Sequence, residues 1–219
     1  MHSAFLHDHP EISKGLDYLL NTHKQFAKFS IERSGFQWPK FEKGFPGLVR
    51  IVLGQQVSTH AANAMWQKLL SKTNGEVTPD TLCALNENDF KETGFSRQKK
   101  ATVLNLVYAV QDRSLDFDRI CNLSDTEVTE ALTAYKGLGV WSARMYLIFC
   151  LARPDIWAPD DLGVREGLRL YLGSQERPDS KLAETYREEF SPYCTAACLL
   201  LWTIKAGGPK EGGAAGRAG

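Results

Sequence analysis

The stretch Tyr135-Lys136-Gly137-Leu138-Gly139-Val140-Trp141-Ser142-Ala143 lies past the middle of the 219-residue chain and decides its fold. Ser124-Asp125-Thr126-Glu127 precedes it as a capping box, and apolar residues at helical spacing follow that box. Val140 to Ala152 forms a second strongly apolar helical run. The sequence therefore predicts a helix, a tight Gly-x-Gly turn and a second helix.

The two glycines of this turn allow the backbone to take positive φ and allow a second backbone to come close. Unpaired N–H groups at the start of the second helix would favour an anion, such as a nucleic-acid phosphate. An ordinary corner between two helices with a glycine turn is the alternative, and the hairpin alone does not decide between the two.

Two further motifs bear on that choice. Trp157-Ala158-Pro159-Asp160-Asp161-Leu162-Gly163-Val164-Arg165 follows the hairpin, and Phe45 to Ser58 reads FPGLVRIVLGQQVS. Together the three motifs resemble the helix-hairpin-helix (HhH-GPD) DNA glycosylase superfamily, and within it the alkylbase branch of the 3-methyladenine DNA glycosylase II type. The resemblance covers roughly residues 44–204.

Composition is that of a soluble globular protein, with 43% hydrophobic and 24% charged residues. Apolar runs such as Ala196 to Trp202 are too short to span a bilayer, and the N-terminus lacks a signal-peptide pattern. We therefore expect no membrane association and no secretion, with the protein in the cytoplasm or nucleoid of a bacterium or in the nucleus of a eukaryote. Nothing indicates an oligomer, so we expect a monomer.

Charge is balanced, with 26 basic and 26 acidic residues. Neutrality counts mildly against nucleic-acid binding, although a local basic face suffices for phosphate contacts. Arg97, Lys99 and Lys100 lie in the first turn of a predicted helix, where cations oppose the helix dipole. They form either a solvated face or a basic edge that faces phosphates.

Helical patterns recur along the chain and no stretch alternates like a strand, so we predict an all-α fold. The predicted helices are 10–33, 45–56, one capped by Ser58, one opened by Thr78-Pro79-Asp80, one started by Ser96, the two of the hairpin, 161–172, 178–190 and 192–206. The resemblance implies two helical lobes with a cleft between them: residues 45–154 as a helical barrel, and residues 1–44 with 155–206. Residues 207–219, rich in glycine and alanine, are expected to be a disordered tail.

Asp160 and Asp161 follow Pro159 and open a helix, so one of them could simply be an N-cap. By motif position Asp161 matches the catalytic aspartate of the family, and Asp160 would be structural. Cleavage of an N-glycosidic bond builds positive charge on the deoxyribose, which an ionised carboxylate stabilises, and the carboxylate could also orient or deprotonate the attacking water. Family branches that also cut the strand carry a lysine where this chain has Trp141, and Lys136 is expected at the surface. The resemblance therefore implies a glycosylase without lyase activity.

Trp141 and Trp202 match base-pocket tryptophans of the alkylbase branch, and Met145 stands where some relatives have an aromatic residue. An electron-rich indole face attracts a cationic alkylated purine, although either tryptophan could be plain core. By motif position Gln56 is the side chain that fills the gap left by the extruded base, and Gln55 is a neighbouring polar contact. A glutamine that merely faces solvent is the alternative for Gln56. The resemblance implies DNA contacts from Gln55, Gln56, Lys136, Gly137 and Gly139.

Cofactors are not expected. The five cysteines are odd in number and sit in apolar helical contexts, which is typical of buried free thiols in a reducing compartment. Iron–sulfur relatives carry four cysteines near the C-terminus, whereas this chain has Cys194 and Cys198, so we predict no cluster. The five histidines form no metal-ligand pattern, and His2, His7 and His9 are expected in a flexible end. Hairpin carbonyls of the family can bind a monovalent cation when DNA is present.

The favoured interpretation is a monofunctional glycosylase that removes alkylated purines, notably of the 3-methyladenine type, from double-stranded DNA in base excision repair. A glycosylase for another base lesion is one alternative. A non-catalytic helix-hairpin-helix module that binds bent or damaged duplex is another, although Asp161 argues against it.

Overall fold

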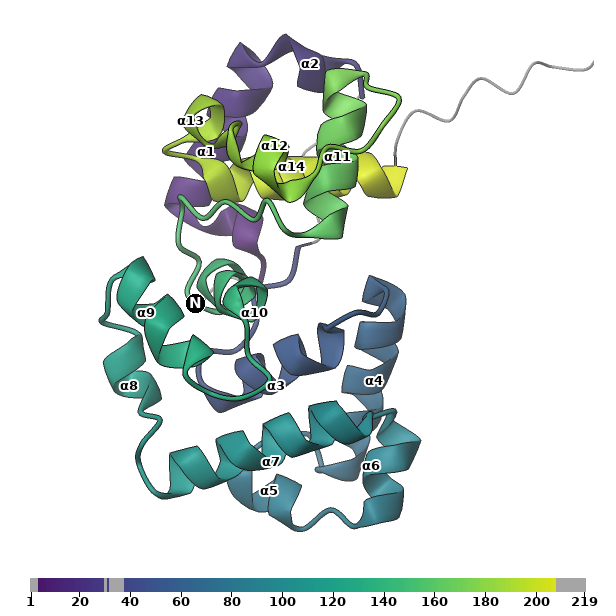
Figure 1. Ribbon diagram of the computed structural model, residues 1–219, viewed down its shortest axis with the longest axis vertical. Coiled ribbons are helices and arrows are strands. Elements are labelled where there is room, and N and C mark those ends of the chain that lie inside the picture. Colours follow the sequence, from purple (N-terminus) through teal and green to yellow (C-terminus); the bar gives the residue numbers. More distant parts are fainter. Residues whose placement is uncertain (1–3, 30, 32–37, 208–219) are drawn as a thin grey trace, which may run out of the picture. The chain divides into compact units, whose positions relative to one another are not determined.

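The computed structural model describes residues 4–29, 31 and 38–207, and the regular elements of this part of the chain are helices joined by loops (Figure 1). Within these residues the only extended pairing is an isolated antiparallel bridge between Phe5 and Pro39. The all-α prediction is therefore confirmed for the described residues. Residues 208–219, most of the predicted tail, and His2 lie outside them.

The chain divides into two compact units, Lys40–Leu151 and Met1–Pro39 together with Ala152–Gly219. The predicted lobes were divided instead at 44/45 and at 154/155, so the observed boundaries fall a few residues earlier. No helix of the described residues is long and apolar enough to cross a membrane.

The continuous unit, Lys40–Leu151, is built around α7, the long helix that packs against α3 and α5 (Figure 1). Its core is formed by apolar side chains such as Leu48, Leu53, Leu106 and Leu132, none of which is exposed. Its elements are α3 (Phe45–Gly54), α4 (Thr59–Lys72), α5 (Pro79–Cys83), α6 (Glu87–Thr93), α7 (Arg97–Gln111), α8 (Phe117–Ile120), α9 (Asp125–Thr133), α10 (Val140–Met145) and the π-helical segment η3 (Tyr146–Cys150).

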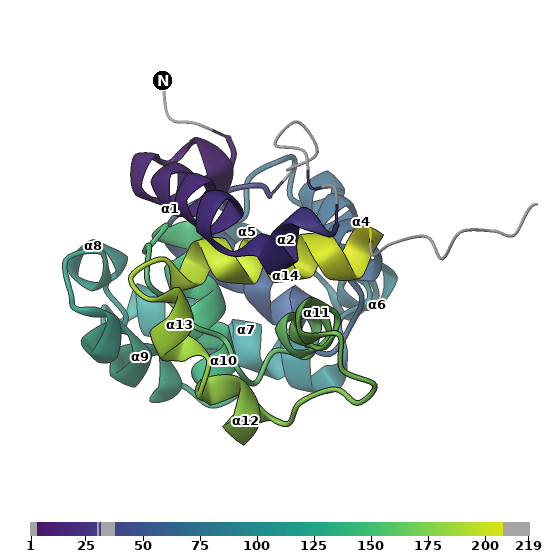
Figure 2. The same cartoon turned by 90° about the horizontal axis from the view of Figure 1, so that it is seen from above.

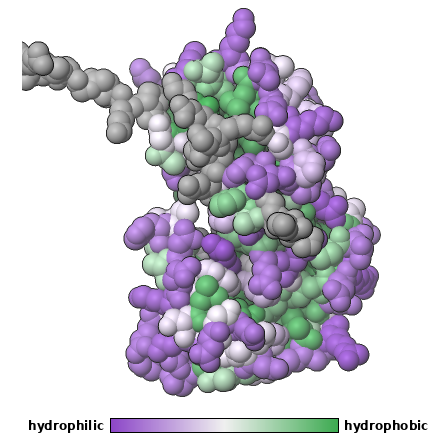
Figure 3. All heavy atoms as spheres, turned by 180° about the vertical axis from the view of Figure 1, so that it is seen from behind, coloured by the Kyte–Doolittle hydropathy of each residue, from purple (hydrophilic) through white to green (hydrophobic). Residues whose placement is uncertain are grey.

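The discontinuous unit is organised by α14, which lies against both α11 and α1 (Figure 2). All residues of α14 from Cys194 to Trp202 are buried, so this part of the helix is covered on every side rather than along one apolar stripe. The elements of this unit are η1 (Leu6–Asp8), α1 (Pro10–Thr22), α2 (Lys24–Ala27), α11 (Leu162–Leu172), α12 (Ser180–Glu184), α13 (Arg187–Phe190) and α14 (Cys194–Gly207). On the face shown in Figure 3, hydrophilic residues predominate on the surface of both units.

Local capping signals correctly placed most helix starts. The side chains of Ser58, Thr78, Ser96 and Ser124 each accept a hydrogen bond from a backbone N–H in the first turn of their helix. Thr78 and Ser124 form full capping boxes, in which a side chain at the third helical position bonds back. Two short helices, α6 and α8, were not predicted, although Asn86 and Asp116 cap them in the same way.

The predicted helix 10–33 was wrong, because the structure ends α1 at Thr22 and α2 at Ala27. The break falls at His23, whose φ of −97° and ψ of 89° are not helical. Its ring Nδ1 lies 3.0 Å from the hydroxyl of Tyr171, so a tertiary contact accompanies the break. Arg33 itself lies outside the described residues.

Other predicted helices were too long. The helix predicted for 178–190 is two short helices separated at Thr185 and Tyr186, and the one predicted for 192–206 begins at Cys194. The helix predicted for 45–56 ends at Gly54, because Gln55 is extended. The flexible end predicted around His7 and His9 was also wrong, since His7 belongs to η1 and stacks on Phe5.

Close packing of α11 on α14 depends on Gly167. A Cβ at this position would lie 2.2 Å from the carbonyl oxygen of Leu201 and 2.6 Å from its carbonyl carbon. Since backbone atoms cannot move aside as a flexible side chain can, we expect Gly167→Ala to lower the free energy of unfolding by about 1–3 kcal/mol.

Chemical denaturation of wild type and variant measures this difference. The matched control is Gly54→Ala, because a Cβ on that helical glycine would meet only the Cβ of Ala62, at 3.9 Å. The control should be neutral or more stable than wild type. Equal stability of Gly167→Ala and wild type would contradict the packing argument.

Candidate functional site

The hairpin between α9 and α10 requires glycine at its first Gly position. Gly137 has φ +96°, and a Cβ there would lie 2.0 Å from Oγ1 of Thr102 on α7. Both the left-handed backbone and the contact with α7 therefore exclude a side chain. The predicted local structure, a helix followed by a Gly-x-Gly turn and a second helix, is confirmed.

Gly139 is different from Gly137. Its φ is −109°, which any residue can adopt, so of the two glycines Gly137 alone uses the positive φ that glycine allows. A Cβ at Gly139 would meet nothing within 4 Å, and the residue is exposed. Nothing in the described part of the protein thus explains this glycine. Lys136, two residues before Leu138, is exposed as predicted.

The end of α3 adjoins this hairpin. The Nε2 group of Gln55 donates to the carbonyl oxygen of Gly137 at 3.0 Å and to Oγ of Ser142 at 3.0 Å. Gln56 follows with φ +54°, a left-handed conformation that is uncommon for a residue with a side chain, and it is exposed. The structure therefore brings Gln55 to the hairpin and leaves Gln56 at the surface.

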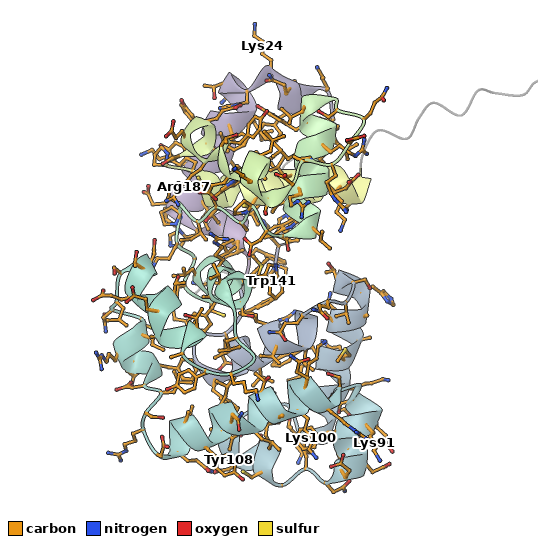
Figure 4. The ribbon with its side chains drawn as sticks, in the orientation of Figure 1. Lys24, Lys91, Lys100, Tyr108, Trp141 and Arg187 are labelled. Atoms are coloured by element: carbon orange, nitrogen blue, oxygen red, sulfur yellow. The ribbon has the colours of Figure 1, made fainter. Side chains whose placement is uncertain are left out.

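The basic first turn of α7 was only partly predicted. Lys99 is neither solvated nor at a surface edge: it is 9% exposed, and its Nζ donates to the carbonyl oxygen of Leu53 at 2.7 Å. Burial lowers the pKa of its ammonium group. Lys100, which is labelled in Figure 4, forms an ion pair with Glu87, and its ammonium nitrogen lies 5.1 Å from the ring centre of Phe90. The side chains of Lys99 and Lys100 thus both bind partners of the continuous unit.

Trp141 lies in the first turn of α10, just after the hairpin (Figure 4). It is half-buried, so it is not a plain core residue. Met145 lies one turn further along the same helix and is only 4% exposed. The helix places both residues on the segment that follows the hairpin.

Asp161 is in the other unit and caps α11. Its Oδ1 accepts a hydrogen bond from the backbone N–H of Val164 at 2.9 Å and a second from Nε1 of Trp202 at 2.8 Å. The prediction that one of the paired aspartates is an N-cap is confirmed for Asp161, whereas Asp160 is exposed. Gly163 leaves room for this arrangement, because a Cβ there would lie 2.7 Å from the indole of Trp202.

Trp202 also contacts a residue that sequence reasoning missed. The rings of Trp38 and Trp202 lie 5.5 Å apart at 46°, and Nε1 of Trp38 donates to Oγ1 of Thr203 at 3.2 Å. Trp38 is half-buried and belongs to no helix, so helical spacing could not reveal it. Its position just before Pro39 was the only local signal. Trp38, Trp202 and Asp161 form one cluster in this unit.

The cysteines were partly mispredicted. All five are free, but Cys83 is exposed and Cys121 is half-buried, so only Cys150, Cys194 and Cys198 are buried thiols. Burial raises the pKa of the Cys150 and Cys194 thiols, which keeps them protonated and unreactive. Among the described residues no group of three or more His, Cys, Asp or Glu side chains is placed to hold a metal ion.

Comparison with known proteins assigns the family. The model of the HhH-GPD superfamily of base excision DNA repair proteins matches residues 49–192. The chain belongs to this superfamily. The matched range contains the hairpin motif, the motif around Asp161 and all but the first four residues of the motif at 45–58, the three motifs that first pointed to this family.

Individual HhH-GPD relatives cover most of the chain. DNA-3-methyladenine glycosylase 1 of Schizosaccharomyces pombe is 32% identical over 165 residues, which is 71% of this chain and 69% of that protein. The structure of S. pombe 3-methyladenine DNA glycosylase in complex with abasic DNA gives a TM-score of 0.80 at 27% identity, and covers 88% of this chain and 97% of that one. The structure of Bacillus halodurans DNA-3-methyladenine glycosidase gives a TM-score of 0.67 at 30% identity, and covers 91% of this chain and 90% of that one.

Two substitutions at Asp161 distinguish its structural role as a helix cap from the role of its charge. We expect Asp161→Ala to lower the free energy of unfolding by about 1 kcal/mol, because the first turn of α11 loses its acceptor. Asp161→Asn should cost less, since an amide oxygen can accept the same two hydrogen bonds.

Urea unfolding of the three proteins tests this expectation. Asp179→Ala is the matched control, because Asp179 caps α12 in the same way, accepting from the N–H of Leu182, but accepts no hydrogen bond from an indole of the described residues. If Asp161→Asn proved less stable than Asp161→Ala, the carboxylate would hold the fold through its charge rather than through its acceptor geometry.

Proposed function

We propose that the chain is a DNA glycosylase that hydrolyses the N-glycosidic bond of alkylated purines of the 3-methyladenine type, as part of base excision repair. The observation that carries the proposal is the carboxylate of Asp161, fixed by the first turn of α11 and by the indole of Trp202. The names of its relatives, DNA-3-methyladenine glycosylases, support the same substrate class.

Hydrolysis breaks the bond between C1′ of the deoxyribose and the purine nitrogen, and the electron pair of that bond leaves with the base. Positive charge develops on the sugar, and the Asp161 carboxylate stabilises it electrostatically. A water oxygen then bonds to C1′ and loses a proton, which Asp161 accepts or passes to solvent. The products are an abasic site and the free base.

Selection of alkylated purines follows from the chemistry of the lesion. An N3- or N7-alkylated purine carries positive charge, so indole faces such as those of Trp141 and Trp202 attract it more than the normal base. The same charge makes the base a good leaving group, which reduces the need for a general acid. Met145 would shape the pocket without adding an aromatic face.

Double-stranded DNA with a damaged base is the proposed partner. The open space at Gly139 and the exposed Lys136 support a close approach of the phosphate backbone to the hairpin. Gln56 is proposed to fill the gap left by the base, and the chain is proposed to act as a monomer. A monovalent cation at the hairpin carbonyls would join only when DNA is bound.

No iron–sulfur cluster is proposed. Cys194 and Cys198 lie one turn apart on α14, and their thiols face the carbonyl oxygens of Arg187 and Ile156 at 3.6 and 3.7 Å. A four-cysteine site would need two more thiolates at this place.

Removal of the charge on Asp161 is the main test. We expect Asp161→Asn to release 3-methyladenine from methylated duplex DNA about 10²–10⁴-fold more slowly than wild type, because the fixed negative charge is lost while the cap is retained. Single-turnover release of the free base measures the rate. A variant as fast as wild type would remove Asp161 from the mechanism, and a wild type without activity would reject the function itself.

Absence of lyase activity is a separate expectation. Trp141 occupies the position at which strand-cutting branches carry their Schiff-base lysine, so borohydride should trap no covalent complex between the protein and DNA containing an abasic site. Gel electrophoresis of the borohydride-treated mixture shows the adduct if one forms. Trp141→Lys provides the comparison variant, and a trapped wild-type adduct would make the protein bifunctional.

A further inference from the structure

The turn that ends α3 holds Gln56 in an unfavourable conformation. A residue with a side chain at φ +54° places its Cβ against the carbonyl oxygen, which is why glycine, asparagine and aspartate usually take such positions. This conformation persists only where the surrounding structure holds it. Two side chains hold this turn: Lys99, from α7, bonds to the backbone of Leu53, and Gln55, the residue before Gln56, bonds to the hairpin and to α10.

Lys99 is the first of these clamps. Its ammonium group reaches from α7 to the carbonyl oxygen of Leu53, three residues before Gln56, at 2.7 Å. This carbonyl belongs to the last turn of α3, where the four final oxygens lack partners within the helix and where positive charge is favoured. A lysine that is 9% exposed is unfavourable unless its charge is used, so a leucine or methionine would be the simpler core residue here.

Gln55 is the second clamp. Its amide donates to the carbonyl oxygen of Gly137 and to Oγ of Ser142, both at 3.0 Å, and so ties the turn to the hairpin and to α10. The hairpin in turn rests on α7 through Gly137 and Thr102. The end of α3, the hairpin and α7 therefore form a closed set of contacts around the backbone that carries Gln56.

We propose that Lys99 and Gln55 are positioning residues, which hold the turn so that the side chain of Gln56 can enter the duplex when a base is extruded. The inference rests on the proposed glycosylase function and on the role proposed there for Gln56. Lys99 acts through the Leu53 carbonyl and Gln55 acts through the hairpin, and neither needs to touch the reacting atoms. Loss of either contact lets the turn relax away from the left-handed conformation.

A positioning role has a consequence that a general loss of stability does not have. Filling the gap matters most when the lesion is paired, because the base must then be removed from its partner and from the stack. It matters least when no partner holds the lesion. The effect of the clamps on excision should therefore depend on how the lesion is paired.

The test compares single-turnover excision of 7-methylguanine placed opposite cytosine with excision of the same base opposite an abasic-site analogue. We expect Lys99→Met and Gln55→Leu each to slow excision from the paired substrate about tenfold or more, and from the unpaired substrate no more than about twofold to threefold. Gln56→Ala should show the same dependence on pairing. Lys99→Arg, which keeps a charged donor, should recover part of the loss.

The matched control is Lys72→Met. Lys72 is a surface lysine of the same unit, and its ammonium group pairs with Asp89 and Glu92 at 2.9 and 2.6 Å rather than with a backbone carbonyl. This variant loses the same charge and should match wild type on both substrates. Thermal unfolding of each variant identifies any that is not folded at the assay temperature.

Equal slowing of the paired and unpaired substrates by both clamp variants would overturn the inference, and so would wild-type rates on both. If Lys99→Met does not fold, Gln55→Leu decides by the same comparison, because its side chain is only half-buried. A wild-type protein that excises neither substrate, and releases no base from methylated DNA, would instead reject the proposed function.

Discussion

One carboxylate oxygen, Oδ1 of Asp161, accepts hydrogen bonds from the first turn of α11 and from the indole of Trp202 on α14. The geometry of this group therefore depends on how closely the two helices pack. Gly163 and Gly167 permit that packing, because a Cβ on either would strike Trp202 or the backbone of Leu201. The buried helix α14 thus does two things: it completes the core of its unit, and it orients the candidate catalytic charge.

An equivalent constraint governs the continuous unit, although there it is a backbone carbonyl that is held. The carbonyl of Gly137 accepts from Gln55, and the same glycine packs on Thr102 without room for a side chain. The hairpin is consequently fixed from two sides, by α3 and by α7. A surface that must meet a phosphate backbone without rearranging benefits from such support, because order already present in the free protein does not have to be gained on binding.

The sequence correctly predicted those features of the structure that depend on residues close together along the chain. Caps at Ser58, Ser96 and Ser124 were found because a side chain and an N–H three residues away suffice to define them. What depends on distant partners was missed. The helix break at His23 is accompanied by a contact of its ring with the hydroxyl of Tyr171, 148 residues away. The burial of Lys99 is accompanied by its hydrogen bond to the carbonyl oxygen of Leu53. The aspartate pair that opens a helix after Pro159 indicated a cap, but no local pattern could show that the capping oxygen of Asp161 also accepts from Trp202.

The exceptions to ordinary packing rules in the continuous unit argue for a functional surface there. A glutamine in a left-handed conformation, a buried lysine and a half-exposed tryptophan would each be replaced in a protein optimised for stability alone. Hydrogen bonds of Gln55, and the contact of Thr102 with Gly137, link Gln56 to the hairpin, and Lys99 joins the same set through Leu53. Such unfavourable features persist where they are needed together, and here Gln56 and Trp141 lie in two of the motifs that resemble the HhH-GPD superfamily. The stability lost at this surface is compatible with folding because the apolar core beneath it, formed by α3, α7 and η3, is closed to solvent.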